Sequence, residues 1–287
     1  MPATKLELLA AARDGNTYQV NKLLDEGADP NMQDETGGTA LYAASSEGQS
    51  ETVRLLLHRG ANPNAQKKDG GTALVEAVHC KHVEVMDLLL TNGADPNLQS
   101  QYGDSALTWA ARNRSTTMTR MLLKNGADPN LQNKDGYTAL ILAIVWKRVK
   151  AVAVLLTNGA DPNLPHNDGD TPLIVTTRKG NLEITSWLLA DGADPNTQNQ
   201  YGETALIEAA DNGHARIVNL LLTNRADPYV KDKQGRTALS RATQNGHNAA
   251  VNALLHAHTE HFNHYSDILR TLVGDNAVDR MMENVSG

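Results

Sequence analysis

Residues that could perform chemistry are concentrated in two short stretches of the chain. The first stretch is HCKHVE, with His79, Cys80, His82 and Glu84, and it could supply a nucleophilic thiol and an imidazole base. An enzyme needs such groups to converge in a pocket that excludes water. Here they fall on the polar side of one predicted helix and on the turn after it. We therefore expect no catalysis, and ordinary reactivity of the Cys80 thiol.

The second stretch holds four of the ten histidines, which lie at His256, His258, His261 and His264. Spacings of two and three residues could bring some of these imidazoles to one metal ion. Neither a cysteine nor a pair of histidines at i and i+4 reinforces such a site. We expect a solvated helix end with no metal and no cofactor, and metal binding remains a remote alternative.

A repeat of 33 residues organises the elements that position these side chains. The octapeptide TNGADPNL occurs at 91–98 and again at 157–164, with KNGADPNL at 124–131 between them. The phrase GADPN, or a close variant, begins at positions 27, 60, 93, 126, 159, 192 and 225 without one insertion. Such a period is typical of supersecondary units that bury their apolar faces against one another.

Each repeat is predicted to contain two helices and an extended turn. A Thr or Ser begins the first helix at positions 39, 72, 105, 138, 171, 204 and 237, where its hydroxyl can cap the helix. A small residue follows five positions later, and a pair of leucines such as Leu89 and Leu90 predicts the buried side of a second helix. The glycine of GADPN then ends this helix, and Asp-Pro continues in an extended conformation.

This pattern resembles the ankyrin repeat, whose consensus carries a T-P-L-H start, a glycine between the helices, a leucine pair and a G-A-D tail. The resemblance implies an all-α solenoid of stacked helix-turn-helix repeats with short hairpin-like loops. We expect eight repeats over residues 1–258, with the first as an N-terminal cap. Residues 259–287 are expected to form degenerate C-terminal capping helices.

Two departures from the family pattern affect the predicted structure. The histidine after T-P-L is absent from every repeat, so mostly apolar packing is expected to join neighbouring repeats. The glycine between the helices is replaced by Lys81, Arg114 and Lys147, and we expect these turns to be built differently. Arg225 replaces the glycine of the last phrase, where Asn224 is expected to take the left-handed conformation.

The first helices of repeats 4 to 6 carry an unusual outward side. The positions that are polar elsewhere hold Leu142, Val145 and Trp146 in repeat 5, with aromatic and basic residues in the repeats on either side. Family resemblance implies that this side and the hairpin tips form a concave surface for partners. The candidate binding residues are Tyr102, Trp109, Arg112, Asn113, Tyr137, Leu142, Val145, Trp146, Arg178, Lys179 and Tyr201. The alternative, that the apolar trio packs inside, remains open.

Composition excludes several classes of function. The net charge of −7 and pI of about 5.8 argue against nucleic acid and membrane surfaces as partners. A local basic stripe remains an alternative, formed by Arg112, Arg114, Arg120, Lys124, Lys147, Arg148, Arg178 and Lys179. The longest apolar stretch, near 141–146, is far too short to span a bilayer. The single cysteine is typical of a reducing compartment, so we expect a cytoplasmic protein.

Together these observations predict a non-enzymatic scaffold or adaptor, expected to be monomeric, that binds another protein. The partner would present an apolar anchor beside acidic residues, with Trp109 and Trp146 gripping the anchor while Arg112, Arg178 and Lys179 steer the acidic flank. An inhibitor or immunity-type protein, or a secreted bacterial effector, that occludes a partner's active site is the alternative function. Metal binding and nucleic-acid binding are more remote.

Overall fold

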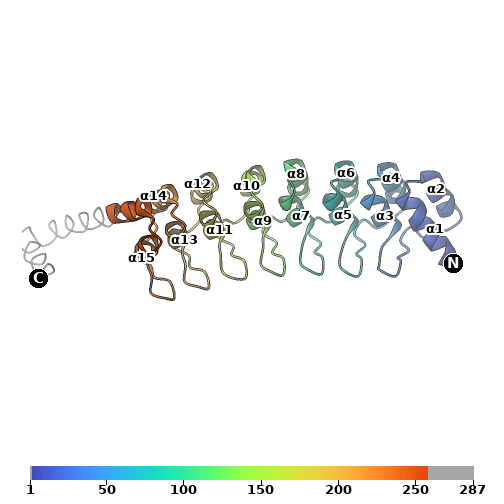
Figure 1. Cartoon of the computed structure of the whole chain (residues 1–287). Helices are drawn as coiled ribbons and strands as arrows, with labels where there is room; N and C mark the ends of the chain where they lie inside the picture. The colour runs from blue at the N-terminus through green and yellow to red at the C-terminus, as the bar shows by residue number, and fades with distance from the viewer. Residues whose placement is uncertain (1, 258–287) are drawn as a thin grey trace, which may run out of the picture. The chain divides into compact units, whose positions relative to one another are not determined.

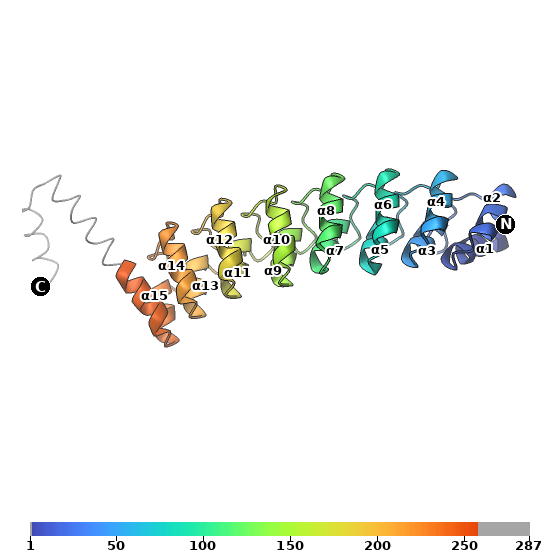
Figure 2. The same cartoon turned by 90° about the horizontal axis from the view of Figure 1, so that it is seen from above.

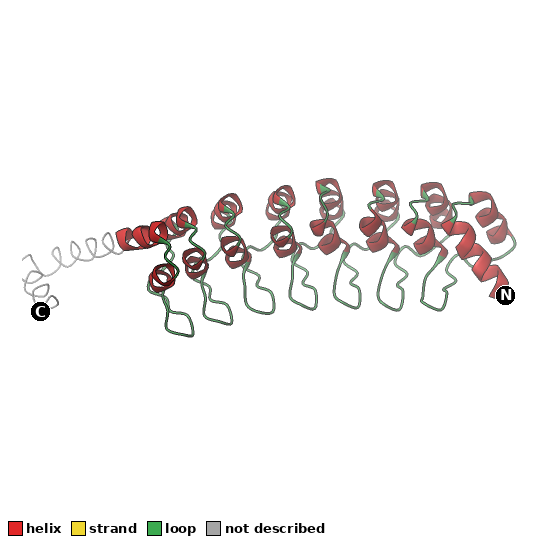
Figure 3. Ribbon diagram, viewed as in Figure 1, coloured by secondary structure: helices red, strands yellow, loops and turns green. Residues whose placement is uncertain are grey.

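A computed structural model describes residues 2–257, which form helices joined by loops (Figure 3). Within this range the only β-type pairing is a single bridge between Gln66 and Thr72. The chain divides into two compact units, Met1–Asn167 and Asp168–Gly287, called here the N-terminal and C-terminal units and described separately. The capping helices predicted at 259–287 lie outside the described residues.

The N-terminal unit contains five pairs of helices, one pair for each of repeats 1 to 5 (Figure 1). The pairs are α1 (Pro2–Arg13) and α2 (Thr17–Asp25); α3 (Ala40–Ser46) and α4 (Ser50–His58); α5 (Ala73–Cys80) and α6 (Val83–Thr91); α7 (Ala106–Arg112) and α8 (Thr116–Lys124); α9 (Ala139–Val145) and α10 (Val149–Leu156). Within this unit the hairpin loops extend on the side of the odd-numbered helices (Figure 1). Successive pairs lie side by side in both views (Figure 2).

The C-terminal unit contains repeats 6 to 8 and uses the same plan. Its helices are α11 (Pro172–Arg178), α12 (Leu182–Ala190), α13 (Ala205–Asp211), α14 (Ala215–Thr223) and α15 (Ala238–Gln244), followed by a helix over 248–257. These helices pack in the same pairwise order, with α13 against both α11 and α15. The predicted all-α fold of helix-turn-helix repeats is therefore confirmed.

The hydroxyl residues that the sequence predicts as helix caps do begin the first helix of each repeat. From repeat 2 to repeat 8, the hydroxyl oxygen accepts a hydrogen bond from the amide three residues later. Thr39, for example, accepts from the Tyr42 amide at 3.1 Å. Pro172 follows Thr171 at the first helical position, where an N–H would have had no helical partner.

The buried core follows the repeated Leu and Ala positions. Leu107 and Ala110 are buried on α7, and the first leucine of each pair, such as Leu89 on α6, is buried as well. Because the alanines are small, helices of adjacent repeats can approach closely, and α7 packs against both α5 and α9. The core is consequently renewed at every contact between repeats within a unit.

An asparagine in the GADPN phrase joins neighbouring repeats within each unit. Asn97 donates from Nδ2 to the Gly126 carbonyl at 2.9 Å and accepts through Oδ1 from the Asp128 amide at 2.7 Å. The same pair of bonds is made by Asn31, Asn64, Asn130 and Asn196. Both partner atoms lie in the following copy of the phrase, so an insertion between two copies would displace both bonds.

A glutamine forms a second link between repeats. The side chains of Gln33, Gln66, Gln99, Gln132 and Gln198 each donate to the backbone carbonyl 33 residues later. Together with the asparagines, these glutamines supply polar links at positions other than that of the missing family histidine. The expectation that mostly apolar packing joins the repeats is therefore incomplete.

The turns without the expected glycine differ from one another. Lys81 and Lys147 keep the left-handed conformation of a glycine turn, with φ of 66° and 56°. Arg114 does not. The prediction that these turns are built differently therefore holds for Arg114 and is wrong for Lys81 and Lys147. Arg225 itself is left-handed with φ of 66°, whereas Asn224 has φ of −101°. The prediction that Asn224 takes this role is wrong, because the turn geometry is fixed by position and Arg225 stands at the glycine position.

Replacing Lys81 by glycine is expected to stabilise the protein by about 0.5–1 kcal/mol, because a side chain in the left-handed region carries steric strain. The free energy of unfolding, measured with urea and far-UV circular dichroism, checks this change. Arg114→Gly is the matched control, and it should destabilise the protein because no left-handed strain is relieved there. A shift in the same direction for both variants would contradict the assignment of strain.

Asn97→Ala is expected to lower the free energy of unfolding by about 1–2 kcal/mol, since it removes both hydrogen bonds between two repeats. Asn92→Ala is the control, because Asn92 Nδ2 bonds only to the Leu88 carbonyl of its own helix, at 2.8 Å. Urea midpoints of the two variants give the comparison. Equal losses would show that the bridge contributes no more than a local helix-end bond.

Candidate functional site

The predicted site residues of the N-terminal unit belong to the odd-numbered helices and to the hairpins before them. We call the accessible side chains of α3, α5, α7, α9 and their hairpins the hairpin-side face. Along its repeats 2 and 3, the Tyr42 hydroxyl donates to Glu76 Oε2 at 2.6 Å. Burial first, and then this carboxylate, raise the pKa of Tyr42. The Lys67 ammonium lies 4.7 Å from the Tyr42 ring centroid, so this contact joins two helices and a hairpin.

Trp109 on α7 is half-buried between two polar neighbours. Its ring lies 4.9 Å from the His79 ring of the preceding repeat, measured between centroids. On its own helix, the Arg112 guanidinium carbon lies 5.0 Å from the centroid of a Trp109 ring. A cation at this distance is attracted to the indole face. These neighbours hold the indole in place before any partner binds.

Arg112 is tied to its own repeat and is not a free charge. Its guanidinium donates to Asp104 Oδ1 at 3.1 Å, and Asp104 is only 7% exposed. Asn133 from the next hairpin donates to the same carboxylate oxygen at 3.1 Å. Asp104 thus joins a helix end to two hairpins, and Arg112 acts mainly as its counter-charge.

The apolar trio of repeat 5 divides between the core and the surface. Leu142 is only 5% exposed, so its side chain packs in the core and offers little surface to a partner. Val145, the last residue of α9, is half-buried, and Trp146, which caps the C-terminal end of this helix, is 51% exposed. Of these three residues, only Trp146 therefore presents a large apolar area to a partner.

The remaining candidates in the N-terminal unit have different surroundings. Tyr102 at a hairpin tip is 66% exposed. Tyr137 is half-buried, with its ring 4.8 Å from that of His166. Asn113 donates from Nδ2 to the Val78 carbonyl at 3.3 Å, a bond between repeats. Tyr102 is thus exposed like Trp146, whereas Tyr137 and Asn113 take part in packing.

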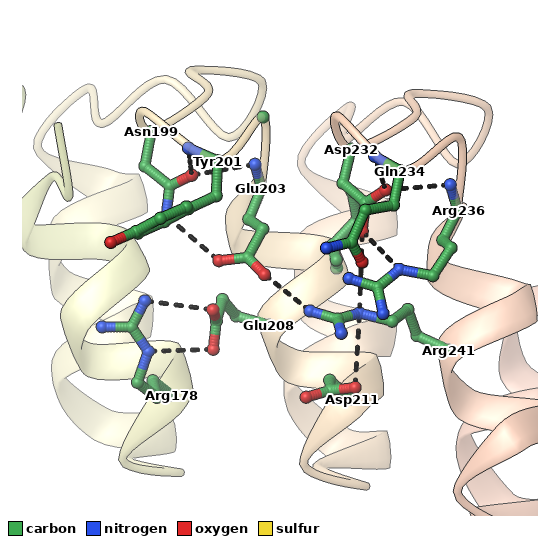
Figure 4. Close-up of polar contacts among 12 residues, drawn as sticks. Arg178, Asn199, Tyr201, Glu203, Glu208, Asp211, Asp232, Gln234, Arg236 and Arg241 are labelled. Carbon is green, nitrogen blue, oxygen red and sulfur yellow. Dashed lines mark hydrogen bonds and ion pairs between the residues drawn. The ribbon is translucent and has the colours of Figure 1, made fainter. Parts of the chain in front are cut away.

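In the C-terminal unit, Arg178 is held by two carboxylates, those of Asp170 and Glu208. Figure 4 shows its contact with Glu208. Arg178 lies 2.6 Å from Asp170 and 3.0 Å from Glu208. Burial alone would lower the pKa of Arg178, but the two carboxylates more than offset it, so that pKa is raised. Burial raises the pKa of Glu208 despite the Arg178 charge. Lys179 is exposed, and so is Tyr201, at 56%.

A second arginine organises the last repeats. Arg241 pairs with Glu203 at 2.6 Å and lies 3.3 Å from Asp211 (Figure 4). Asp232 is bound by Arg236 at 2.8 Å. Burial raises the pKa of Asp232, but the hydrogen bonds from Arg236 and Gln234 lower it by more, so its pKa lies below the usual value. In the C-terminal unit, the charges of Arg178, Arg236 and Arg241 are therefore matched by carboxylates.

The pairing of these arginines is the feature that reasoning from the sequence missed. Arg112 and Arg178 were predicted to steer an acidic partner, yet both pair with an aspartate in their own repeat. A signal was present, because Asp104 and Asp170 each lie eight residues before the arginine. The distance spans a hairpin end and a whole helix, so helical spacing rules do not reveal it.

The HCKHVE stretch does not converge on one centre. His82 bonds through Nε2 to the Ser46 carbonyl at 3.1 Å, and Glu84 lies on α6 beyond the turn. Instead Glu76, His79 and Cys80 place ligand atoms within 4.8 Å of one another, a set that could hold a metal ion on the exposed side of α5. Burial, and then Glu76, raise the pKa of the Cys80 thiol, which opposes its activation as a nucleophile.

The second histidine stretch reaches the end of the described residues. His256 belongs to the helix over 248–257, while His258, His261 and His264 lie outside the described range. Among the described helices, none combines the length and the apolar character needed to cross a membrane.

Comparisons with known proteins agree with this geometry. A family model described as "Ankyrin repeats (3 copies)" matches residues 8–100, 87–166, 155–232 and 173–266. Among solved structures, the chain is similar to the ankyrin repeat domain of Bcl-3, a unique member of the IkappaB protein family. The TM-score is 0.69 and the identity 30%, over 77% of this chain and 99% of that one. A search of curated proteins finds no match.

Cys80 is expected to react with Ellman's reagent more slowly at pH 7 than glutathione does, because its raised pKa leaves less thiolate. Glu76→Gln should accelerate the reaction about two- to fivefold, since it removes a neighbouring negative charge but not the effect of burial. Glu84→Gln, on the next helix, is the control and should change little. Reaction faster than glutathione at neutral pH would instead indicate an activated thiolate.

Proposed function

Because the chain belongs to the ankyrin-repeat family, whose members generally bind other proteins, we propose that it is a non-enzymatic adaptor with a partner-binding surface on repeats 4 and 5. The observation that carries this proposal is the pair of exposed aromatic side chains, Tyr102 in repeat 4 and Trp146 in repeat 5, together with the braced Trp109 of repeat 4. Aromatic residues of this kind supply most of the energy at protein interfaces.

The rigid surroundings of Trp109 also support binding. Its neighbours His79 and Arg112 belong to packed helices, and Arg112 is fixed by Asp104. A side chain that is already ordered loses little conformational entropy when a partner covers it. We therefore propose that a partner inserts an apolar anchor between Trp109 and Trp146 without rearranging the repeats.

An acidic flank on the partner is the second part of the proposal. Lys147, which follows Trp146, is exposed and lies in a stretch without carboxylates. It is better suited to attract an acidic group than Arg112 or Arg178, whose charges are matched within the chain. Lys179 and Tyr201 of the C-terminal unit remain candidates for a separate contact.

A non-enzymatic, intracellular role is proposed on chemical grounds. The single thiol has a raised pKa, and the histidine after it is bonded to a backbone carbonyl. Neither is prepared for nucleophilic catalysis. Cys80 is exposed and free, a state that a reducing compartment preserves.

Trp146→Ala is expected to weaken partner binding by about 2 kcal/mol or more, with an almost unchanged melting temperature, because the indole is half-exposed. Affinity capture with quantitative mass spectrometry, comparing wild type with the Trp109→Ala/Trp146→Ala variant, identifies the partner. Titration calorimetry with that purified partner then gives the affinity of the single variant.

The matched control is Tyr18→Ala, which removes a 79% exposed aromatic residue from repeat 1. It should leave partner affinity unchanged. If Trp146→Ala lowers the melting temperature while affinity stays the same, the indole is a packing residue and the proposed surface is wrong.

A further inference from the structure

The turn between α7 and α8 differs from its counterparts in the N-terminal unit. Arg114 is not left-handed, and Asn113 before it is extended, with ψ of 159°. Across this turn, Arg148 of the next repeat donates from Nε to the Arg112 carbonyl at 2.9 Å. The Arg148 side chain therefore links the turn between α9 and α10, where Lys147 is left-handed, to the turn between α7 and α8, where Arg114 is not.

Beside these turns lies a groove between α8 and α10, called here the α8–α10 groove. Its first part has a volume of about 630 Å³, and Arg114, Trp146 and Val149 are among its lining residues. A second part of about 520 Å³ continues along the two helices, and Thr116 and Lys150 line both parts. The irregular turn thus opens into a continuous groove with a half-exposed tryptophan at one end.

The charge around this groove is the reverse of that of the whole chain. Residues 105–127 and 136–160 contain four and three basic residues, respectively, and no aspartate or glutamate. The net charge of the chain is nevertheless −7. The α8–α10 groove therefore carries a local positive field that the composition as a whole conceals.

One repeat position shows how this field arises. The position twelve residues after the capping hydroxyl holds glutamate in repeats 2, 3 and 6, at Glu51, Glu84 and Glu183. In repeat 5 the same position is Lys150, which is exposed. Lys150 thus places a positive charge at the rim of the groove, at a repeat position that carries a negative charge in three other repeats.

The cations at the rim are not matched by nearby carboxylates. Among the described residues, no ion pair involves any of the four rim cations, Arg114, Arg120, Lys147 and Lys150. Arg178 and Arg241 of the C-terminal unit, by contrast, each pair with two carboxylates or more. An external acidic group would supply the missing counter-charge.

We propose that the α8–α10 groove is a second docking surface, which binds a short acidic segment of a partner protein carrying an apolar anchor beside Trp146. Its floor includes Val149 and Val154, which suit an aliphatic or aromatic side chain. Acidic residues on either side of that anchor meet Lys147, Lys150 and Arg120. The proposal rests on the proposed function in taking the partner to be a protein, and the groove shares Trp146 and Lys147 with the surface proposed there.

A protein segment fits this groove better than a nucleic acid does. Only four rim cations are available, which is few for neutralising a phosphate backbone. The apolar floor would be left uncovered by a sugar-phosphate chain. An acidic peptide matches both the rim and the floor.

The test uses the full chain and a fluorescein-labelled peptide of about ten residues, made of glutamates and glycines around two central leucines. Fluorescence anisotropy at low salt should detect binding. A peptide with serines in place of the leucines, and one with lysines in place of the glutamates, should each bind at least about tenfold more weakly. A single-stranded oligouridine of similar length should bind less tightly than the acidic peptide.

Lys150→Glu and Arg120→Glu should each weaken binding of the acidic peptide by about tenfold or more, and Trp146→Ala by a similar factor. Arg216→Glu is the matched control, because Arg216 occupies the repeat position of Lys150 in repeat 7, and it should change affinity less than about twofold. Circular dichroism verifies that each variant is folded.

Tyr102→Ala separates this surface from the hairpin-side face. It should leave binding of the peptide unchanged while weakening capture of the partner of the proposed function. If Tyr102→Ala abolishes peptide binding and Lys150→Glu does not, the groove proposal fails and the proposed function stands. Failure of the acidic peptide to bind at low salt, or tighter binding of oligouridine, overturns the groove proposal as well.

Discussion

Within each unit, the structure depends on the pair of hydrogen bonds that a GADPN asparagine makes to the next repeat. Asn97 bonds to the Gly126 carbonyl and to the Asp128 amide, and the equivalent asparagines repeat this geometry within each unit. Each of these asparagines bonds to the first carbonyl and the third amide of the following phrase, so the bonds help to fix the distance between the repeats that they join. The strict spacing of 33 residues follows, because any inserted residue would break polar and apolar contacts together.

This regular stacking makes local exceptions visible and useful. Where every repeat has the same backbone, a change of side chain at one position alters the surface without altering the fold. Trp146 at the end of α9 and Lys150 near the start of α10 are such changes. The turn at Arg114 is an exception in the backbone itself, and the α8–α10 groove lies beside it. Binding surfaces in this chain thus arise from departures from the repeat.

Cations in this chain are either paired with carboxylates of the fold or exposed without one. In the C-terminal unit, Arg178 and Arg241 are each paired with two or more carboxylates, so their charges stabilise contacts between helices and hairpins. In repeats 4 and 5, Arg112 is enclosed in the same way by Asp104, but Lys147 and Lys150 face solvent without a matching carboxylate. Charges paired within a fold contribute little to partner recognition, whereas unpaired surface charges steer association.

The sequence by itself determined the repeats, the capped helix starts, the leucine and alanine core and the family, because these depend on contacts within one turn of helix or on the fixed period. Tertiary structure alone decided that Leu142 is buried, that Arg112 and Arg178 are paired, that Arg225 and not Asn224 is left-handed, and that a groove follows α8 and α10. Burial and ion pairing depend on side chains supplied by neighbouring hairpins and repeats. Their positions follow only once the helices are packed in three dimensions.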